Sequence, residues 1–218
     1  MSRLIIILVF VTIIQGQRRD IDTTNCEDFR ANFNLKKIIG SWYVVAIIPE
    51  KHFPVNQEQV TCYRVEFSET DVAGLRWLIN KTFESPSRKE LINRIQGTIV
   101  RQRYHTVPPF DVWSRSVEEV NGCFQQVLSL DTDKSDINKA LTHEALMQLH
   151  LMETNDSGPF LLQILWGRMI SVVIYRRKQG VSLDQLRPVT EMMTKLRGPQ
   201  LKPKLCDKTL KDLLGLRS

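Results

Sequence analysis

After Gly40 the sequence breaks into short runs rich in apolar and β-branched residues, and turn-forming stretches separate them. Short strands at even spacing, with no helical period between them, favour an antiparallel sandwich or barrel. Nine runs are candidate strands: Ser41–Ile48, Gln59–Ser68, Leu75–Phe83, Glu90–Arg103, Phe110–Val117, Cys123–Leu130, Ala145–Met152, Phe160–Trp166 and Ile170–Arg176. An eight-stranded barrel needs one strand fewer, so either the last two runs form one bent strand or one middle run is a loop.

The hydrophobic period changes near the C-terminus. Apolar residues recur there at steps of three and four: Leu183, Leu186, Val189, Met192, Met193 and Leu196. This spacing predicts an amphipathic helix with Ser182 as its N-cap and Gly198-Pro199 as its stop. A single helix after an all-β series is expected to pack against the outside of the barrel.

The first residues predict a secretory signal peptide. Met1-Ser2-Arg3 is a short basic start, and Leu4 to Ile14 is apolar but for one threonine. This run is shorter than the roughly 20 residues that a bilayer-spanning helix needs, and the small residue Gly16 suits a cleavage site. We therefore expect residues 1–16 to be removed, and residues 17–218 to form one secreted, extracellular domain without stable membrane insertion.

An oxidising compartment makes disulfide formation the expected role of the four cysteines, Cys26, Cys62, Cys123 and Cys206. Four cysteines allow two disulfides in three connectivities, and their wide spacing excludes a CxxC-type zinc site. The secretory pathway also makes two sequons, beginning at Asn80 and at Asn155, candidate glycosylation sites.

Motifs for catalysis, metal binding and nucleotide binding are missing from the sequence. His143-Glu144 begins an apparent HExxH zinc motif, but Met147 takes the place of the second histidine. No Gly-x-Ser-x-Gly elbow, Walker loop or dinucleotide fingerprint occurs. We therefore expect no enzymatic activity, no metal and no cofactor.

Positive charge is concentrated at the C-terminus. The chain carries a net charge of +6, and residues 176–218 alone contribute +7. Such a basic region can contact acidic surfaces, or it can be a solvated helix face followed by an extended tail. Its basic residues are not interleaved with aromatic ones, so we expect no nucleic-acid binding.

One segment carries a family resemblance. Asn34 to Ala46 contains Gly40-Ser41-Trp42-Tyr43 and resembles the first structural motif of the lipocalins, in which Gly-x-Trp-Tyr opens the first strand. A chain that turns into a strand here needs the conformational freedom of glycine, and a closed barrel needs one large flat side chain across its bottom. The family's third motif is an arginine at the end of the last strand, and Arg176 matches it, with Arg177 as the competing choice.

The resemblance implies a fold and a disulfide pattern. The fold is all-β: an eight-stranded antiparallel up-and-down calycin barrel over residues 40–177, a C-terminal helix packed outside over 182–197, and a disulfide-tethered tail over 198–218. The cysteines resemble those of the insect bilin-binding and apolipoprotein D-like branch, which implies the pairs Cys26–Cys123 and Cys62–Cys206. The second motif is degenerate, because Leu130 to Asp133 lacks its tyrosine.

Strand alternation predicts which side chains line a cavity. If Asn80 is glycosylated it points outward, and then Leu75, Trp77, Ile79 and Phe83 point into the barrel. If Cys62 bonds a tail that lies outside, then Tyr63, Val65 and Phe67 point inward. Trp113 and Tyr104, near the Pro108-Pro109 turn, are expected at the cavity mouth.

We therefore expect a secreted carrier or scavenger of a small hydrophobic ligand, of the pigment, retinoid, sterol or fatty-acid class. The ligand would bind because its apolar surface leaves water, at about 25 cal/mol per Å². The alternative is a secreted interaction protein whose barrel is filled by its own side chains and whose basic surface meets a protein or an acidic polysaccharide. Cavity volume and salt-sensitive retention on heparin distinguish the two, and the oligomeric state stays open.

Overall fold

The computed structural model describes residues 26, 29–49, 60–117, 120–131, 146–155, 158–166 and 172–209, so the expected signal peptide lies outside the described residues. The strands are β1 (Gly40–Ile48), β2 (Val60–Cys62), β3 (Arg64–Glu69), β4 (Ile99–Tyr104), β5 (Phe110–Ser116), β6 (Cys123–Asp131), β7 (Leu146–Met152), β8 (Phe160–Trp166), β9 (Val172–Arg176) and β10 (Lys204–Thr209). The helices are α2 (Leu35–Ile38), α3 (Val72–Thr82), α4 (Ser87–Arg94) and α6 (Arg187–Arg197). No helix in the described ranges is long and apolar enough to cross a bilayer.

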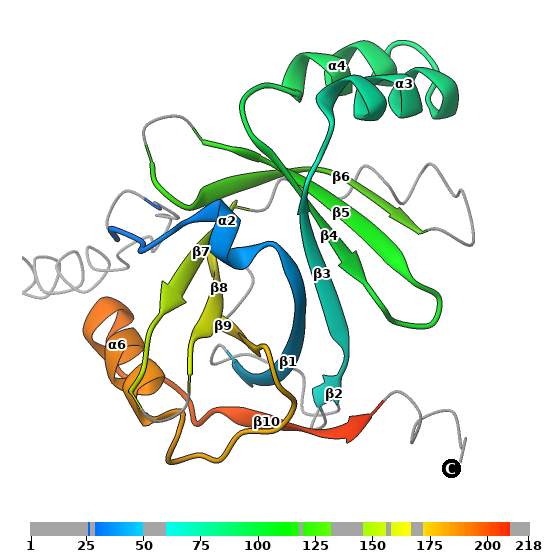
Figure 1. Cartoon of the computed structure of the whole chain (residues 1–218). Helices are drawn as coiled ribbons and strands as arrows, with labels where there is room; N and C mark the ends of the chain where they lie inside the picture. The colour runs from blue at the N-terminus through cyan, green and yellow to red at the C-terminus, as the bar shows by residue number, and fades with distance from the viewer. Residues whose placement is uncertain are drawn as a thin grey trace, which may run out of the picture.

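Eight of the strands form a closed barrel (Figure 1). Beginning with β1, the order is β1-β3-β4-β5-β6-β7-β8-β9, each neighbour pair is antiparallel, and pairing of β9 with β1 closes the ring. The expected eight-stranded antiparallel calycin barrel is therefore confirmed. The last two candidate strands are separate barrel strands, β8 and β9, rather than one bent strand.

Two further strands lie beside the barrel where β1 and β3 part. The first half of β1 pairs with β3, and its second half pairs with β10 at Ala46 and Ile47. On its other edge β10 runs parallel to β2. The Cys62–Cys206 disulfide joins these two strands, so the C-terminal segment is bonded to the strand that leads into β3.

Helix α6 packs against the outside of the barrel, as expected (Figure 1). Leu186, Val189 and Met193 are buried against the outward-facing side chains of β1, β8 and β9. The helix begins at Arg187 and follows a turn in which Ser182 Oγ accepts a hydrogen bond from the backbone N–H of Gln185. The serine therefore caps this turn rather than the helix itself. Gly198 ends the helix with a positive φ of 79°.

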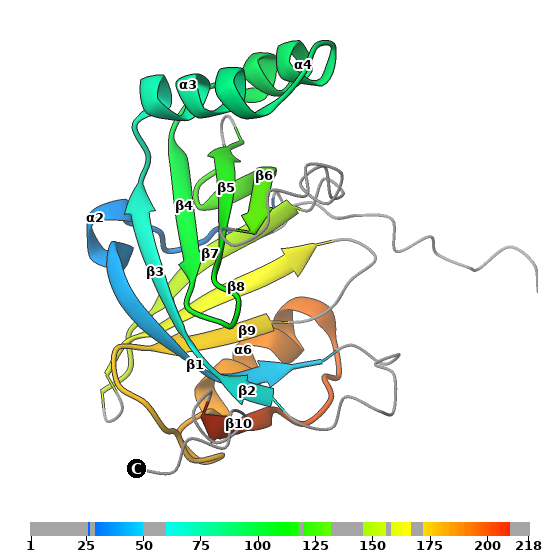
Figure 2. The ribbon, with the colours of Figure 1, turned by 90° about the vertical axis from the view of Figure 1, so that its right-hand side faces the viewer.

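A helical hairpin replaces one predicted strand and part of another. The runs Leu75–Phe83 and Glu90–Arg103 were expected as strands, but α3 and α4 occupy 72–82 and 87–94, and only β4 is a strand there. The Asp71 carboxylate caps α3 by accepting from the amides of Ala73 and Gly74. The hairpin lies across the ends of β3, β4 and β5 (Figure 2), and it packs on the outward side of the sheet.

The residues before α2 are tied to the far side of the barrel. Cys26 is bonded to Cys123 at the start of β6, so both disulfide pairs implied by the lipocalin resemblance are present. The backbone N–H of Asn32 donates to His150 Nδ1 at 2.9 Å, and the backbone carbonyl of Asn32 accepts from the backbone N–H of Leu151 at 2.7 Å. Gly122 allows this close passage, because a Cβ at its position would lie 2.9 Å from the Phe33 Cβ atom of the passing segment.

Candidate functional site

The end of the barrel at which β1 begins is sealed, and we call it the closed half. Its inward side chains form one apolar cluster in which Trp42, Phe67, Phe124 and Tyr175 are at most 2% exposed. Helix α2 lies against this end, with Ile38 fully buried in the same cluster. The Trp42 indole nitrogen donates to the Ile38 carbonyl at 2.7 Å, so the tryptophan is held in place beside the helix.

Arg177, rather than Arg176, covers the tryptophan. The Arg177 guanidinium lies 3.9 Å from the centre of the Trp42 ring and donates to the carbonyls of Lys37, Ile39 and Ser41. The arginine of the third motif is therefore Arg177, the competing choice, and its assignment to Arg176 was wrong by one residue. Arg176 instead lies over Phe160 at 5.4 Å and donates to the Gly180 carbonyl. Gly40 has a φ of +102°, as expected for a glycine at the entry to the strand.

The end at which β1 finishes is different, and we call it the open half. Cross-strand pairing identifies the inward side chains, because Phe110 and Val112 pair with Tyr104 and Gln102, and the Gln102 side chain reaches Gln163 on β8 across the barrel. The inward side chains of the open half are nevertheless partly exposed: Ile47, Tyr63, Tyr104, Phe110, Val112, Leu165 and Val173. A side chain that faces the barrel axis and keeps accessible surface lines a space that solvent can enter.

A polar cluster forms the floor of the open half. It consists of Gln102, Tyr104, Gln163 and Tyr175, which we call the floor cluster. Gln163 Oε1 accepts one hydrogen bond from Gln102 Nε2 and one from the Tyr175 hydroxyl, both at 2.8 Å. Burial raises the pKa of Tyr175 well above its ordinary value, and burial also raises the pKa of Tyr104 although hydrogen bonds with Gln163 and Tyr175 oppose this. Both phenols are therefore neutral hydrogen-bonding groups at physiological pH.

The aromatic rings of the open half pack on one another. Tyr104 stacks on Phe110 with ring centres 4.5 Å apart and an interplanar angle of 4°. Tyr63 contacts Tyr104 at 5.9 Å, and burial is the main cause of its raised pKa. The inward side chains of the open half named above are all uncharged. This half of the barrel therefore offers a ligand aromatic walls and uncharged polar groups.

The cavity predictions divide by strand. Val65 and Phe67 are fully buried and face the barrel interior, and Tyr63 is packed against them, so the alternation deduced from Cys62 is correct for β3. Sequence alone had placed Tyr104 near the mouth, and its side chain does face the open half. No pattern pointed to Gln102 or Gln163, because their pairing requires β4 and β8 to face each other.

The alternation deduced from Asn80 is wrong, because this residue lies on α3. Four predicted cavity residues belong to the helical hairpin and lie outside the barrel: Leu75, Trp77, Ile79 and Phe83. Trp77 is 62% exposed, whereas the other three are buried beneath the hairpin. Trp113 was expected at the mouth, yet it lies on the outward face of β5 within that same core. Asn80 and Asn155 are both exposed, and Ser157 of the second sequon lies outside the described residues.

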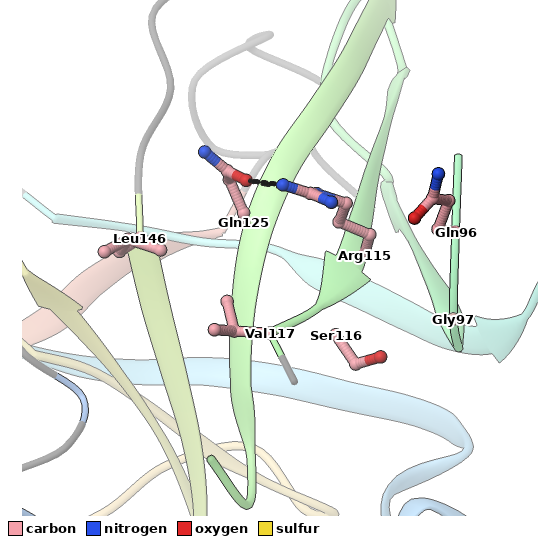
Figure 3. A pocket seen from close by; sticks show the side chains of 7 residues that line it. All are labelled: Gln96, Gly97, Arg115, Ser116, Val117, Gln125 and Leu146. Atoms are coloured by element: carbon pink, nitrogen blue, oxygen red, sulfur yellow. Dashed lines mark hydrogen bonds between the residues drawn. The ribbon is translucent and has the colours of Figure 1, made fainter. Parts of the chain in front are cut away.

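Two surface hollows lie on the outward face of the barrel. The larger, of about 380 Å³, is lined by Gln96, Gly97, Arg115, Ser116, Val117, Gln125 and Leu146 (Figure 3). Arg115 donates to Gln125 across its wall through Nε and Nη2. The smaller, of about 260 Å³, lies beside the start of α3 and is lined in part by Arg101 and Trp113.

In the described part of the chain, no three His, Cys, Asp or Glu side chains gather closely enough to hold a metal ion, and all four cysteines are in disulfides. His52 and His143 lie outside the described residues.

No protein-family model matches the chain, and a search of curated protein sequences finds no significant match. Functional inference therefore rests on the fold and on the two unlike halves of the barrel.

Proposed function

We propose that this protein is a secreted lipocalin that carries a small hydrophobic ligand in the open half of its barrel. Three features support membership of that family: the calycin-type barrel with α6 outside, the stacking of Arg177 on Trp42, and the two disulfide pairs of the bilin-binding and apolipoprotein D-like branch. The disulfides also fit an extracellular location. The role is transport or sequestration, with no covalent step and no cofactor.

The partly exposed inward side chains of the open half carry the proposal. A barrel filled by its own side chains would bury these residues as completely as it buries Trp42 and Phe67. A bound lipophile would cover them instead, and removal of apolar surface from water stabilises such a complex by about 25 cal/mol per Å². Eight-stranded barrels are just wide enough to hold one small ligand.

The first experiment is native mass spectrometry, with an absorption spectrum, on protein purified from its own secretory source. A non-covalent small molecule released on denaturation would support the carrier role and identify the ligand class. A protein that arrives empty and binds no member of a lipophile panel would overturn the proposal and favour a role for the basic surface, for which salt-sensitive retention on heparin is the test.

A matched pair of variants locates the binding site. Val112→Trp adds a large side chain to the interior of the open half, whereas Val107→Trp adds it to a residue that is 62% exposed in the β4–β5 connection. With Nile red as the probe, we expect Val112→Trp to abolish the fluorescence increase and Val107→Trp to leave it unchanged. Equal binding by both variants would exclude the open half as the site.

A further inference from the structure

Within the described part of the barrel, two buried polar atoms at the floor of the open half lack hydrogen-bond partners. Gln102 is 1% exposed and Ser114 is fully buried. Among the described residues, neither Gln102 Oε1 nor Ser114 Oγ has a hydrogen-bond partner. Leaving such a group buried and unpaired costs about 1–3 kcal/mol, so native structures usually supply a partner.

The orientation of Gln102 is fixed by its neighbours. Gln163 Oε1 already accepts from the Tyr175 hydroxyl and can receive only a donor from Gln102, so Gln102 Nε2 must face it. Gln102 Oε1 is then directed away from Gln163 as an unused acceptor. With Gln163 Oε1 in this place, a flipped Gln102 would bring two carbonyl oxygens together.

Ser114 is a diagonal neighbour of Gln102 in the β4–β5 ladder. It pairs with Val100 across the β4–β5 ladder, whereas Gln102 pairs with Val112, so the two residues are diagonal neighbours on the inward face. Diagonal neighbours of an antiparallel pair lie about 7–8 Å apart at the backbone. One small polar group between their side chains can therefore reach both.

We propose that these two atoms bind the polar end of the ligand, and that this end is a neutral hydroxyl rather than a carboxylate. This inference rests on the proposed carrier function. Gln102 Oε1 can only accept, so the ligand group must donate, and the Ser114 hydroxyl can donate to that same group or accept from it. A carboxylate ionised at neutral pH has no proton to donate to Gln102.

The charges around the site also disfavour a carboxylate. The inward side chains of the open half named above include no cation, and the nearest arginines along β4, Arg101 and Arg103, lie on its outward face. Arg101 is moreover paired with Asp111 at 2.6 Å. A buried anion without a cationic partner pays a large desolvation penalty.

The ligand reaches the acceptor when one side chain moves. Tyr104 is the next inward residue of β4 toward the open end, and it keeps accessible surface although its hydroxyl belongs to the floor cluster. Its rotation would uncover Gln102 and give a ligand hydroxyl access to Gln102 Oε1. The Tyr104 hydroxyl bonds to Gln163 and Tyr175 rather than to this acceptor, so Tyr104→Phe should keep the preference for an alcohol.

The test compares three probes that share one hydrocarbon chain: dodecan-1-ol, dodecanoate and methyl dodecyl ether. Each is titrated into the full mature protein loaded with Nile red, and displacement gives the Kd. We expect the alcohol to bind roughly tenfold more tightly than the ether and than dodecanoate, as one net hydrogen bond to a buried acceptor requires. Ser114→Ala and Gln102→Leu should each reduce this preference, while Gln96→Leu, an exposed glutamine outside the barrel, should retain it.

The outcomes separate the two proposals. Equal affinity for all three probes, or tightest binding of dodecanoate, would overturn the hydroxyl site while leaving the carrier role intact. Failure of every probe and of the wider lipophile panel would overturn the carrier role itself. Should Gln102→Leu fail to fold, Ser114→Ala and the comparison of alcohol with ether on the unmodified protein still decide the question.

Discussion

Arg177→Ala tests how the closed half is held together. The substitution removes three hydrogen bonds to carbonyl oxygens, of 2.7, 2.9 and 3.0 Å, and one stacking contact on Trp42. Two of the three carbonyls, those of Lys37 and Ile39, belong to the end of α2 and to its C-cap. The arginine therefore joins α2, the start of β1 and the end of β9 at a single point.

The expected loss of stability is about 2 kcal/mol. Hydrogen bonds contribute a net 0.5–1.5 kcal/mol each, and the lower end of that range, roughly 0.5, applies here because Arg177 is exposed and water can replace it at the freed carbonyls. A cation–π contact at an exposed site adds about 0.5–1 kcal/mol. For a domain of this size, a loss of about 2 kcal/mol lowers Tm by roughly 4–8 °C.

The assay is thermal and guanidinium unfolding with both disulfides intact, and three variants serve as controls. Lys178→Ala removes an exposed neighbouring charge and should change stability by less than about 0.5 kcal/mol. Arg176→Ala should cost about 1 kcal/mol, because it loses the Gly180 hydrogen bond and the contact with Phe160. Arg177→Lys keeps a cation but not the planar fork, and should recover only a small part of the loss. A loss for Arg177→Ala no larger than that for Lys178→Ala would refute the assigned role.

Three further predictions concern other parts of the fold. Replacing both cysteines of the disulfide between β2 and β10 by alanine should lower stability by roughly 2–4 kcal/mol, and an unchanged guanidinium midpoint would contradict the tether. Trp113→Ala should lower the free energy of unfolding by about 3–5 kcal/mol, because this side chain is only 6% exposed. Trp77→Ala should lower it by less than about 0.5 kcal/mol, because that side chain is 62% exposed. Similar losses for the two variants would contradict the burial of Trp113 and the exposure of Trp77 on α3. Burial lowers the pKa of His150 from 6.5, and its Nδ1 accepts from the Asn32 amide, so the unprotonated ring is the native form. Stability should be fully present above pH 6.5 and decline as pH falls through the lower folded pKa, because the unfolded chain then binds more protons. His150→Gln should weaken this dependence in urea unfolding at several pH values, and an unaltered slope would contradict the assignment.

The barrel was predictable from the sequence because its strands are short and regularly punctuated. The helical hairpin α3–α4 was not predicted, because the run from Leu75 to Phe83 fits both a helical period and a strand period. Leu75, Ile79 and Phe83 are apolar at steps of four, which suits a helix face, yet with Trp77 between them they also alternate as a strand would. Asp71 offered a helix N-cap signal that decides between the two periods. A glycosylated Asn80 could not decide, because an exposed asparagine fits either structure.

The strand alternation gave the correct side-chain direction only where its reference residue, the disulfide-bonded Cys62, lies on a strand. Cys62 gave the correct inward set on β3, because a disulfide to an outer segment fixes the face of its own residue. The arginine of the closed half was misplaced by one position, since the exact end of β9 is not encoded in the alternation of its residues. The floor cluster could not be predicted at all, because it joins strands 61 residues apart whose relative register depends on closure of the whole barrel.

The two halves of the barrel suggest why a partly unfilled interior is tolerable. Folded proteins keep only a small margin of stability, so inward side chains that keep part of their surface in contact with solvent reduce that margin. The closed half offsets this reduction, because Trp42, Arg177 and α2 hold several strand ends together at one place. Substitutions in the closed half should therefore change stability with little effect on ligand affinity at temperatures where the protein stays folded. Ser114→Ala at the floor of the open half should instead weaken the binding of an alcohol without lowering stability, since it removes a buried polar atom that has no hydrogen-bond partner among the described residues.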